Sequence, residues 1–413
     1  MERLLRFLAL VVTLAVILGA VVSCATPEAA TPEVIQETVV VKETVVVQAT
    51  PEPAKEPILL GLSESLTGPV AWIGQDFIHG FTLAIDEVNA EGGIDGHPLK
   101  LVPCDNEAVP DKAIACVRRL VEQDGVVMIA ELGNSSASLA SMPIIEEYGV
   151  PGLVCASTNS TITDNSGVGG NIWTFRQNAN DRMMAGAFSG YLIDAADTFC
   201  TLAVNNDWGR GAIAMMKPLL EAGGAEVLSE DYFEQGQPDY RPVITRWKGF
   251  DPQAVYLIME ARDAAVFIRQ YRELGMTAPV FARGSVVTYE FLEAIKDNVA
   301  LGEGIVEATL ANIDADPELV EKYLARWGTM PHVHGAMAYT AMRYVVPEAL
   351  RIALQDSGEL TPSSIRDALE KVSVDTPLIG QIEFDDHNQA HPYMVLQKIE
   401  NGEIVLLDRL PTD

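Results

Sequence analysis

One pair of serines stands where a predicted strand gives way to a predicted helix. Ser135 and Ser136 follow the apolar run Val126–Ile129 after a short loop. The first N–H groups of a helix lack partners inside the helix, and together with a serine hydroxyl they can hold an anion. Serines at a helix start are also common N-caps, so the pair predicts either a cap or part of an anion-binding site.

A second polar loop follows the next predicted strand along the chain. Ala156, Ser157 and Thr158 come directly after the apolar run Gly152–Cys155. Ligands of α/β proteins bind at the carboxyl edge of the sheet, where the ends of parallel strands meet. We therefore expect this loop to lie at the ligand-binding edge of the sheet. Helix capping alone would also account for the hydroxyls.

The elements that position these loops form a repeating pattern. Short apolar runs such as Ile58–Leu62 alternate with amphipathic segments of helical period as far as Cys155. The alternation starts again at Asp181 and continues to Phe281. Successive strand–helix units predict a parallel, doubly wound sheet, so the sequence predicts an α/β protein with two Rossmann-like lobes.

The last third of the chain has a different pattern. Helical periodicity continues to about Val372, and β-rich segments follow from Gln381. Asn401-Gly402 separates two of these segments, and this dipeptide is a strong signal for a β-hairpin.

Motifs of common catalytic and nucleotide-binding sites are missing from the sequence. No G-x-G-x-x-G follows a predicted strand, and neither a P-loop nor the G-x-S-x-G of a hydrolase occurs. His332 with His334, and His387 with His391, lack metal-site spacing and neighbouring cysteines. We expect these histidines to be solvated loop residues. We also expect a binding protein without cofactor or metal, and not an enzyme.

Four cysteines lie in the body of the sequence. Cys104 ends a predicted strand and Cys116 lies on the following helix, so a bridge between them is sterically possible in an oxidising compartment. Cys155 and Cys200 lie in apolar strands, where we expect them to be buried small hydrophobic residues.

The beginning of the sequence has the pattern of an export signal. Arg3 and Arg6 precede the apolar run Phe7–Val22, and Cys24 follows a serine. This ending resembles the lipobox of bacterial lipoproteins, which implies cleavage before Cys24 and attachment of lipid to it. The alternative is a transmembrane helix with an incidental cysteine, but the apolar run is short for a span.

Proline and glutamate are frequent in residues 24–56, which predicts an extended, flexible tether. The whole chain has a formal net charge of −30. This acidity argues against nucleic acid or an anionic membrane surface as a partner, and it favours solubility.

Short motifs along the body resemble one family when their order and spacing are taken together. They are Gly68–Ala71, Asn89–Ile94, Gly133–Ser136, Asp207–Gly211 and Phe384–Asp386. In this order the chain, from Ile58 onward, resembles the leucine/isoleucine/valine-binding proteins, the type I periplasmic receptors of ABC importers. The resemblance implies two lobes joined by three crossovers, with a ligand held between them and the lobes closing like a hinge.

The resemblance also divides the chain. It implies a signal peptide at 1–23, a lipid-anchored linker at 24–56, a first lobe from 57–178 and 309–380, a second lobe from 179–308, and second-lobe and hinge strands at 381–413. The crossovers are expected near Gln177–Asn180, Glu307–Leu310 and Ile379–Asp385.

The family's ligand clamp matches three positions of this sequence. In the family, residues at the positions of Ser135, Ala156 and Thr158 hold an amino acid. Hydroxyls and amides bind its carboxylate, and a carbonyl binds its ammonium.

The apolar side of the clamp has matches as well. Trp208 corresponds to an aromatic residue that packs on the ligand from the second lobe, and Trp72 and Ile73 correspond to the wall of the first lobe. A single tryptophan usually packs in a core, but Trp208 follows the polar stretch Asn205–Asp207.

The sequence departs from the family at the ammonium site. Ser285 occupies the position of the family's carboxylate, and Glu260 occupies that of a tyrosine. Either Glu260 has taken over the ammonium of an amino acid, or Arg283 faces the cleft and binds a second anionic group, as in a dicarboxylate or aromatic acid. A surface position for Arg283 is a third possibility.

The resemblance therefore implies an extracytoplasmic lipoprotein on the outer face of the cytoplasmic membrane. We expect a monomer that captures an amino acid, of branched-chain type or a related small carboxylate, and delivers it to ABC permease subunits. A sensory receptor for a small carboxylate or amide would have the same binding lobes and is the alternative.

Overall fold

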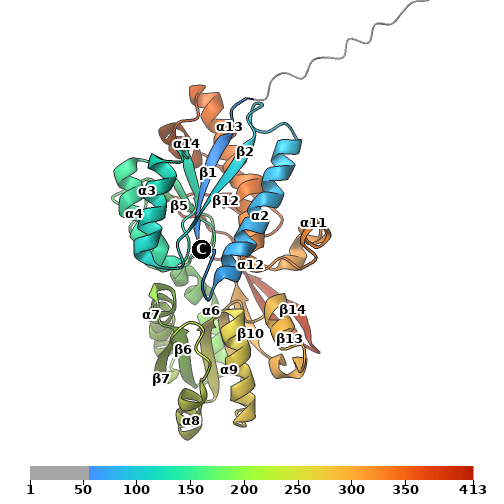
Figure 1. Ribbon diagram of the computed structural model, residues 1–413. Helices are drawn as coiled ribbons and strands as arrows, with labels where there is room; N and C mark the ends of the chain where they lie inside the picture. The colour runs from blue at the N-terminus through green and yellow to red at the C-terminus, as the bar shows by residue number, and fades with distance from the viewer. Residues whose placement is uncertain (1–54, 413) are drawn as a thin grey trace, which may run out of the picture. The chain divides into compact units, whose positions relative to one another are not determined.

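The computed structural model describes residues 55–412, which fold into two lobes that are each built on one sheet (Figure 1). The predicted signal peptide, Cys24 and the tether up to residue 54 lie outside the described residues. Between residues 55 and 412, no helix is both long enough and apolar enough to cross a membrane.

The first lobe contains a five-stranded sheet of order β2-β1-β3-β4-β5, in which all neighbouring strands are parallel. Its strands are β1 (Ile58–Glu64), β2 (Leu99–Asp105), β3 (Met128–Glu131), β4 (Gly152–Val154) and β5 (Thr174–Arg176). The strand order reverses between β1 and β3, and a reversal of this kind opens a crevice at the carboxyl edge.

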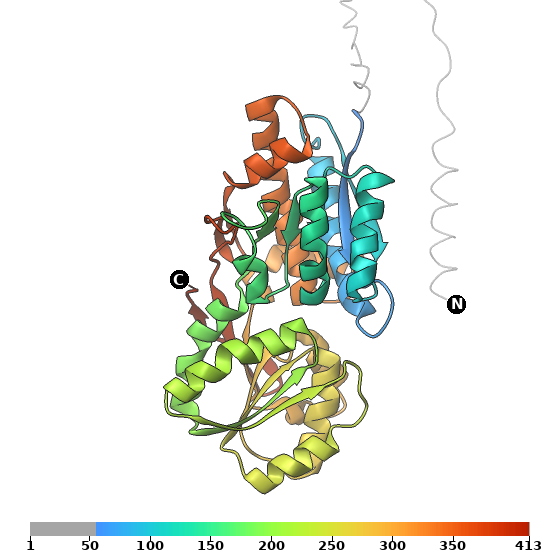
Figure 2. The same ribbon diagram turned by 90° about the vertical axis from the view of Figure 1, so that its left-hand side faces the viewer.

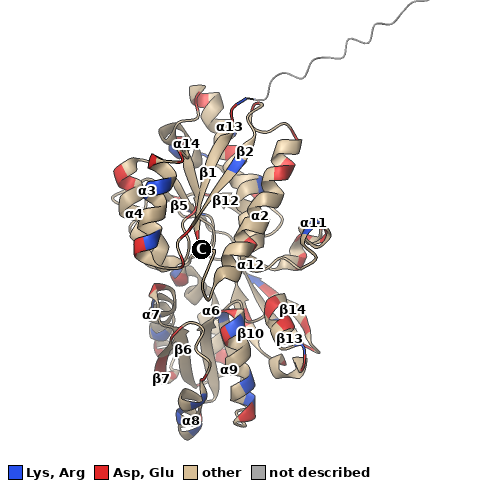
Figure 3. Ribbon diagram, in the orientation of Figure 1, with Lys and Arg blue, Asp and Glu red and all other residues tan. Residues whose placement is uncertain are grey.

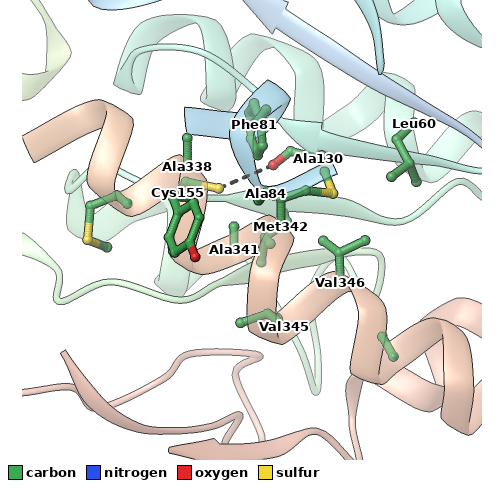
Figure 4. Packing of buried hydrophobic residues seen from close by; sticks show 14 of the residues in the cluster. Leu60, Phe81, Ala84, Ala130, Cys155, Ala338, Ala341, Met342, Val345 and Val346 are labelled. Carbon is green, nitrogen blue, oxygen red and sulfur yellow. Dashed lines mark hydrogen bonds between the residues drawn. The ribbon is translucent and has the colours of Figure 1, made fainter. Parts of the chain in front are cut away.

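Helices cover both faces of this sheet. The helices of the first lobe are α2 (Ala71–Ala90), α3 (Pro110–Glu122), α4 (Ser135–Tyr148), α5 (Ser160–Asp164), α11 (Pro317–Trp327), α12 (Val333–Thr340), α13 (Val346–Ser357) and α14 (Pro362–Leu369). Leu60, Phe81 and Met342 belong to the core between the sheet and α2, α12 and α13 (Figure 4). Val117 and Ile145 of α3 and α4 pack in a second core on the opposite face. Burial on both faces explains why the inner strands β1, β3 and β4 are mostly apolar.

The second lobe repeats the topology of the first. Its seven-stranded sheet has the order β14-β13-β10-β9-β8-β6-β7, and the parallel part β7-β6-β8-β9-β10 follows the pattern of the first sheet. The strands are β6 (Thr198–Val204), β7 (Glu226–Phe233), β8 (Ala254–Met259), β9 (Val280–Gly284), β10 (Val306–Thr309), β13 (Met394–Glu400) and β14 (Glu403–Leu410). The last two are antiparallel and extend one edge.

Two layers of helices enclose the second sheet (Figure 2). These are α6 (Asp181–Ala195), α7 (Asp207–Ala222), α8 (Arg241–Phe250), α9 (Ala261–Glu273) and α10 (Tyr289–Ala294). Phe188 and Met216 pack on one face, and Trp247 and Phe267 pack on the other. The prediction of an α/β protein with two Rossmann-like lobes is confirmed.

The chain passes between the lobes after β5, after β10 and after β12 (Gly380–Glu383). The strand β12 forms a small antiparallel sheet with β11 (Ser373–Thr376), and its Ile382 is buried in the core of the first lobe. Buried side chains join the passages: Arg176 Nε donates to Gln389 Oε1 at 2.8 Å, and Gln389 Nε2 donates to the Asn178 carbonyl at 2.7 Å.

The cysteine and hairpin predictions agree with the structure. A Cys104–Cys116 disulfide joins β2 to α3, while Cys155 and Cys200 are buried free thiols. Asn401 and Gly402 form the turn between β13 and β14.

Close packing of α2 against α12 gives a first prediction. A Cβ atom on Gly80 would lie 2.0 Å from the Gly335 carbonyl oxygen, so Gly80→Ala must push the two helices apart. We expect a loss of about 1–3 kcal/mol in the free energy of unfolding, measured with urea. Gly186→Ala on α6 is the matched control, because nothing lies within 4 Å of its Cβ position. The control should be neutral or stabilising by up to about 1 kcal/mol, and equal losses for both variants would contradict the packing argument.

Candidate functional site

A cavity of about 100 Å³ lies between the lobes, at the carboxyl edges of both sheets. The first lobe contributes the loops after β1, β3 and β4 and parts of α2 and α12. The second lobe contributes the loops after β6, β7 and β8, the ends of β9 and β10, and Met184 of α6. The lining residues are Glu64, Val70, Ile73, Phe77, Gly133, Asn134, Ser135, Ala156, Ser157, Thr158, Met184, Asn206, Trp208, Gln235, Glu260, Arg283, Gly284, Thr309, Leu310, Val333 and His334.

The two polar loops of the first lobe meet at this cavity. Ser135 is the first residue of α4 and is 2% exposed, and its Oγ lies 3.4 Å from the backbone nitrogen of Asn159. Asn134 is the N-cap, since its side chain accepts from the Ala137 N–H. The backbone N–H of Ser135 belongs to the first turn of α4, where the helix itself supplies no acceptor.

The second loop lies on the neighbouring strand β4 and also reaches the cavity. Ala156, Ser157 and Thr158 all line it. The Ser157 hydroxyl donates to the Gly133 carbonyl at 2.5 Å and is therefore engaged by the protein.

Glu260 and Ser285 are in direct contact. Glu260 follows β8 and lines the cavity, and the Ser285 hydroxyl donates to its Oε2 at 2.5 Å. Burial raises the pKa of Glu260 to about 7, an effect that the Ser285 hydrogen bond partly opposes. Ser285 itself is buried behind Glu260, so the carboxylate that faces the cavity belongs to Glu260.

Arg283 is not a surface residue. It is 3% exposed and lines the cavity from β9. Its Nη2 forms a buried ion pair with Asp181 of α6, and it also donates to Thr158 Oγ1 of the first lobe at 2.6 Å. Arg283 Nε is buried and has no partner among the described residues. The guanidinium therefore faces the cleft with its charge already balanced.

Two of the three residues that were predicted to pack on the apolar part of the ligand line the same cavity. Ile73 lies on α2 in the first lobe, and Trp208 approaches from the first turn of α7 in the second. A Cβ atom on Gly284 would lie 3.0 Å from the Trp208 ring, and Gly284 has a φ of +130°, so glycine allows this approach.

The other predicted residues lie just outside the cavity. Ser136 is half-buried, and its Oγ lies 3.4 Å from the Asp207 backbone nitrogen across the lobes. Trp72 lies in an adjoining cavity and packs edge-on against His332 and His334.

The lobes touch around the cavity. Asp181 N donates to the Thr158 carbonyl at 2.6 Å, and Asn159 Nδ2 donates to the Asp207 carbonyl at 2.5 Å. These contacts join the loop after β4 to the starts of α6 and α7, so the cavity is bounded on this side.

Sequence reasoning missed the acid at the end of β1. Glu64 is buried and lines the cavity, and burial raises its pKa to about 7. In the sequence, Glu64 is the middle residue of the polar triplet Ser63–Ser65, which follows the apolar run Ile58–Leu62. A polar loop after an apolar run is the same signal that identified Ser157.

The prediction that His332 and His334 are solvated loop residues is wrong. His334 lies on α12, lines the cavity beside Phe77, and has its pKa lowered to about 3 by burial. His332 is the half-buried N-cap of the same helix. Only the packing of α12 on α2, which is remote in sequence, brings these residues to the cleft.

The comparisons with known proteins agree with this architecture. A "periplasmic binding protein" family model matches residues 57–403. An amino acid binding protein of Pseudomonas aeruginosa is 28% identical over 358 residues, which cover 84% of this chain and 91% of the relative.

Solved structures show the same fold. A branched-chain amino acid transporter substrate binding protein of Streptococcus pneumoniae, in complex with isoleucine, is 22% identical with a TM-score of 0.72, covering 85% of this chain and 100% of that one. A solute binding protein of Rhodopseudomonas palustris, in complex with 3,4-dihydroxybenzoic acid, is 22% identical with a TM-score of 0.76, covering 86% and 98%.

The matched region includes the first sheet, the second sheet up to β13, and every residue that lines the cavity. The resemblance stated from the sequence is thereby confirmed. The chain belongs to the periplasmic binding protein family, whose members are extracytoplasmic solute-binding proteins and not enzymes.

Proposed function

We propose that this protein captures an α-amino acid in the interlobe cavity and delivers it to the permease of an ABC importer. The observation that carries the proposal is the placement of two complementary groups on opposite walls of one small cavity. Ser135 and Thr158 lie on the first lobe and the Glu260 carboxyl lies on the second. An α-amino acid carries a carboxylate and an ammonium close together, and it would bind both walls at once.

The carboxylate end of the ligand would bind the first lobe. The N–H and hydroxyl of Ser135 can donate to it, and the first turn of a long helix favours a negative charge. Thr158 accepts a hydrogen bond from Arg283, so its own hydroxyl proton is free to point at the ligand.

The ammonium end would bind Glu260. Ser285 and Glu260 are the two residues that differ from the family pattern, and they lie side by side, since the Ser285 hydroxyl donates directly to Glu260. A carboxylate is thus kept in the region of the family's ammonium site although its position in the sequence has changed. Trp208 and Ile73 would enclose the aliphatic part of the ligand.

Arg283 is less suited to bind a second anionic group. Asp181 already balances its charge, and a dicarboxylate would bring another negative charge beside Glu64 and Glu260. The names of the relatives point in the same direction, since one is an amino acid binding protein and another binds leucine, isoleucine, valine, threonine and alanine.

The remaining parts of the chain complete the proposal. A lipid on Cys24 would anchor the protein, as a monomer, to the outer face of the cytoplasmic membrane. Residues 24–56 would be the tether. Residues 57–178 with 309–380 would move as one lobe, and 179–308 with the strands that follow β12 as the other.

Replacing Glu260 tests the ammonium contact. Glu260→Gln keeps the shape of the side chain but removes the charge, so we expect amino-acid affinity measured by calorimetry to fall roughly 30-fold or more. The matched control is Glu293→Gln on α10, whose carboxylate is 69% exposed, and its affinity should not change. Unchanged affinity in Glu260→Gln would remove Glu260 from the site.

The pH dependence of binding follows from the raised pKa of Glu260, about 7 in the free protein. Below this pH the carboxyl is protonated and must lose its proton to pair with an ammonium. Affinity should therefore weaken as the pH falls from 8 to 5.5, by up to about tenfold per pH unit.

Titrating variants by calorimetry identifies the group responsible. Glu64 also lines the cavity and has a pKa of about 7, whereas His334, with a pKa of about 3, stays neutral across this range. Glu260→Gln should flatten the profile and Glu64→Gln should preserve it. The reverse pattern would assign the ammonium to Glu64.

The lipid anchor has its own test. Cys24→Ala should abolish the incorporation of labelled fatty acid and release the protein from the membrane fraction in the expressing bacterium. Cys155→Ala, which removes a buried thiol, serves as the control and should stay lipidated. Continued labelling of Cys24→Ala would contradict the assignment.

A further inference from the structure

A second cavity adjoins the binding cavity, which is termed here the inner cavity. This outer cavity has a volume of about 370 Å³ and lies between the loop after β1 and the start of α9. Val70, Gln235 and Glu260 line both cavities. A ligand whose ammonium reaches Glu260 would therefore have free space on the far side of that residue.

Contacts between the lobes border the outer cavity. A Cβ atom on Gly236 of the second lobe would be 3.7 Å from Pro69 Cβ of the first. The Arg262 guanidinium of α9 lies 5.4 Å from the centre of the Trp72 ring of α2. The space between these two contacts is thus part of the cleft.

The acidic residues that line the two cavities have no ion-pair partner in the described part of the chain. Glu64, Glu260 and Asp263 line them, and none of the three lies within 4.0 Å of a Lys, Arg or His nitrogen among the described residues. The two lining arginines are already paired, Arg283 with Asp181 and Arg262 with Glu290 at 2.7 Å. Figure 3 shows that α9 carries acidic and basic residues together. Its cations are therefore not evidence for an anionic ligand.

Asp263 is the acidic residue that an α-ammonium bound to Glu260 would not reach. It is 6% exposed and lines the outer cavity only. Its Oδ1 accepts from the Gly236 N–H and the Tyr240 hydroxyl, both at 2.9 Å. Its Oδ2 has no hydrogen-bond partner among residues 55–412. Burial raises the pKa of Asp263, as expected for a carboxyl that lacks a cationic partner.

Resting on the proposed function, we infer that the preferred ligand is longer than a branched-chain amino acid and carries a cationic group at its far end, which the outer cavity binds at Asp263. The carboxylate of the ligand binds Ser135 and Thr158, its middle passes Glu260, and its far end lies between Trp72 and Asp263. Two kinds of compound have this chemistry. One is an amino acid with a long basic side chain, and the other is a dipeptide with a free amino end.

Calorimetry with L-lysine, L-norleucine, L-leucine and leucyl-leucine tests the inference on the full-length protein. Norleucine has the carbon chain of lysine without the terminal ammonium. If the natural ligand is a basic amino acid, we expect lysine to bind at least tenfold more tightly than norleucine. If the natural ligand is a dipeptide, we expect leucyl-leucine to bind at least tenfold more tightly than leucine.

Two variants test the outer cavity itself. Asp263→Asn should remove the advantage of the cationic ligand while leaving leucine affinity within about twofold. Because Asp263 also accepts from Tyr240, Val266→Phe is the second variant. It fills the outer cavity from the surface of α9 and should exclude the longer ligand alone.

The outcomes separate the two proposals. Leucine binding as tightly as every longer cation, with no effect of either variant, overturns the inference but leaves the amino-acid receptor intact. No binding of any of these compounds overturns both.

Discussion

The carboxyl edges of the two sheets face each other, and this arrangement decides where most polar groups of the cleft lie. Loops at such an edge carry free backbone groups and short polar side chains, and each lobe presents its own set. The ion pair of Arg283 with Asp181 holds β9 to α6 in the second lobe, and Arg283 also donates to Thr158 of the first. The same buried guanidinium thus stabilises the packing within the second lobe and the contact between the two lobes.

Burial without an ion-pair partner is the property that the cleft carboxyls share. Burial raises the pKa of each of them, and an ammonium bound beside the carboxylate would oppose that shift. Glu131, which lies behind Glu64, follows the same rule with a pKa of about 8, but backbone N–H groups of Leu132, Gly133 and Cys155 bind it. It supports the loop and does not face the cavity.

Periodicity predicted the lobes and most strands correctly, because strands buried on both faces are unmistakable apolar runs. Ser135 and Thr158 were also predictable, since the carboxyl edge of a parallel sheet can be read from one strand–loop–helix unit. His334 was not, because its place depends on the packing of α12 against α2. Asp263 stands in the first turn of α9 and resembles any acid that stabilises a helix start. Its position beside the cleft depends on the loop after β7.

The first lobe is discontinuous, and this has a consequence for how the protein matures. Its sheet is made from the early part of the chain, but one face of that sheet is covered by α12 and α13. Most of the second lobe, from α6 to β10, lies between them in sequence, and its strands β13 and β14 come after them. During export the early strands reach the outside first and keep an apolar face uncovered until the last third arrives. The second lobe must also wait for the end of the chain, because β13 and β14 supply Met394, Leu396 and Ile399 to its cores. Neither lobe can therefore complete its core until the last part of the chain has arrived, and both should depend on folding helpers outside the membrane.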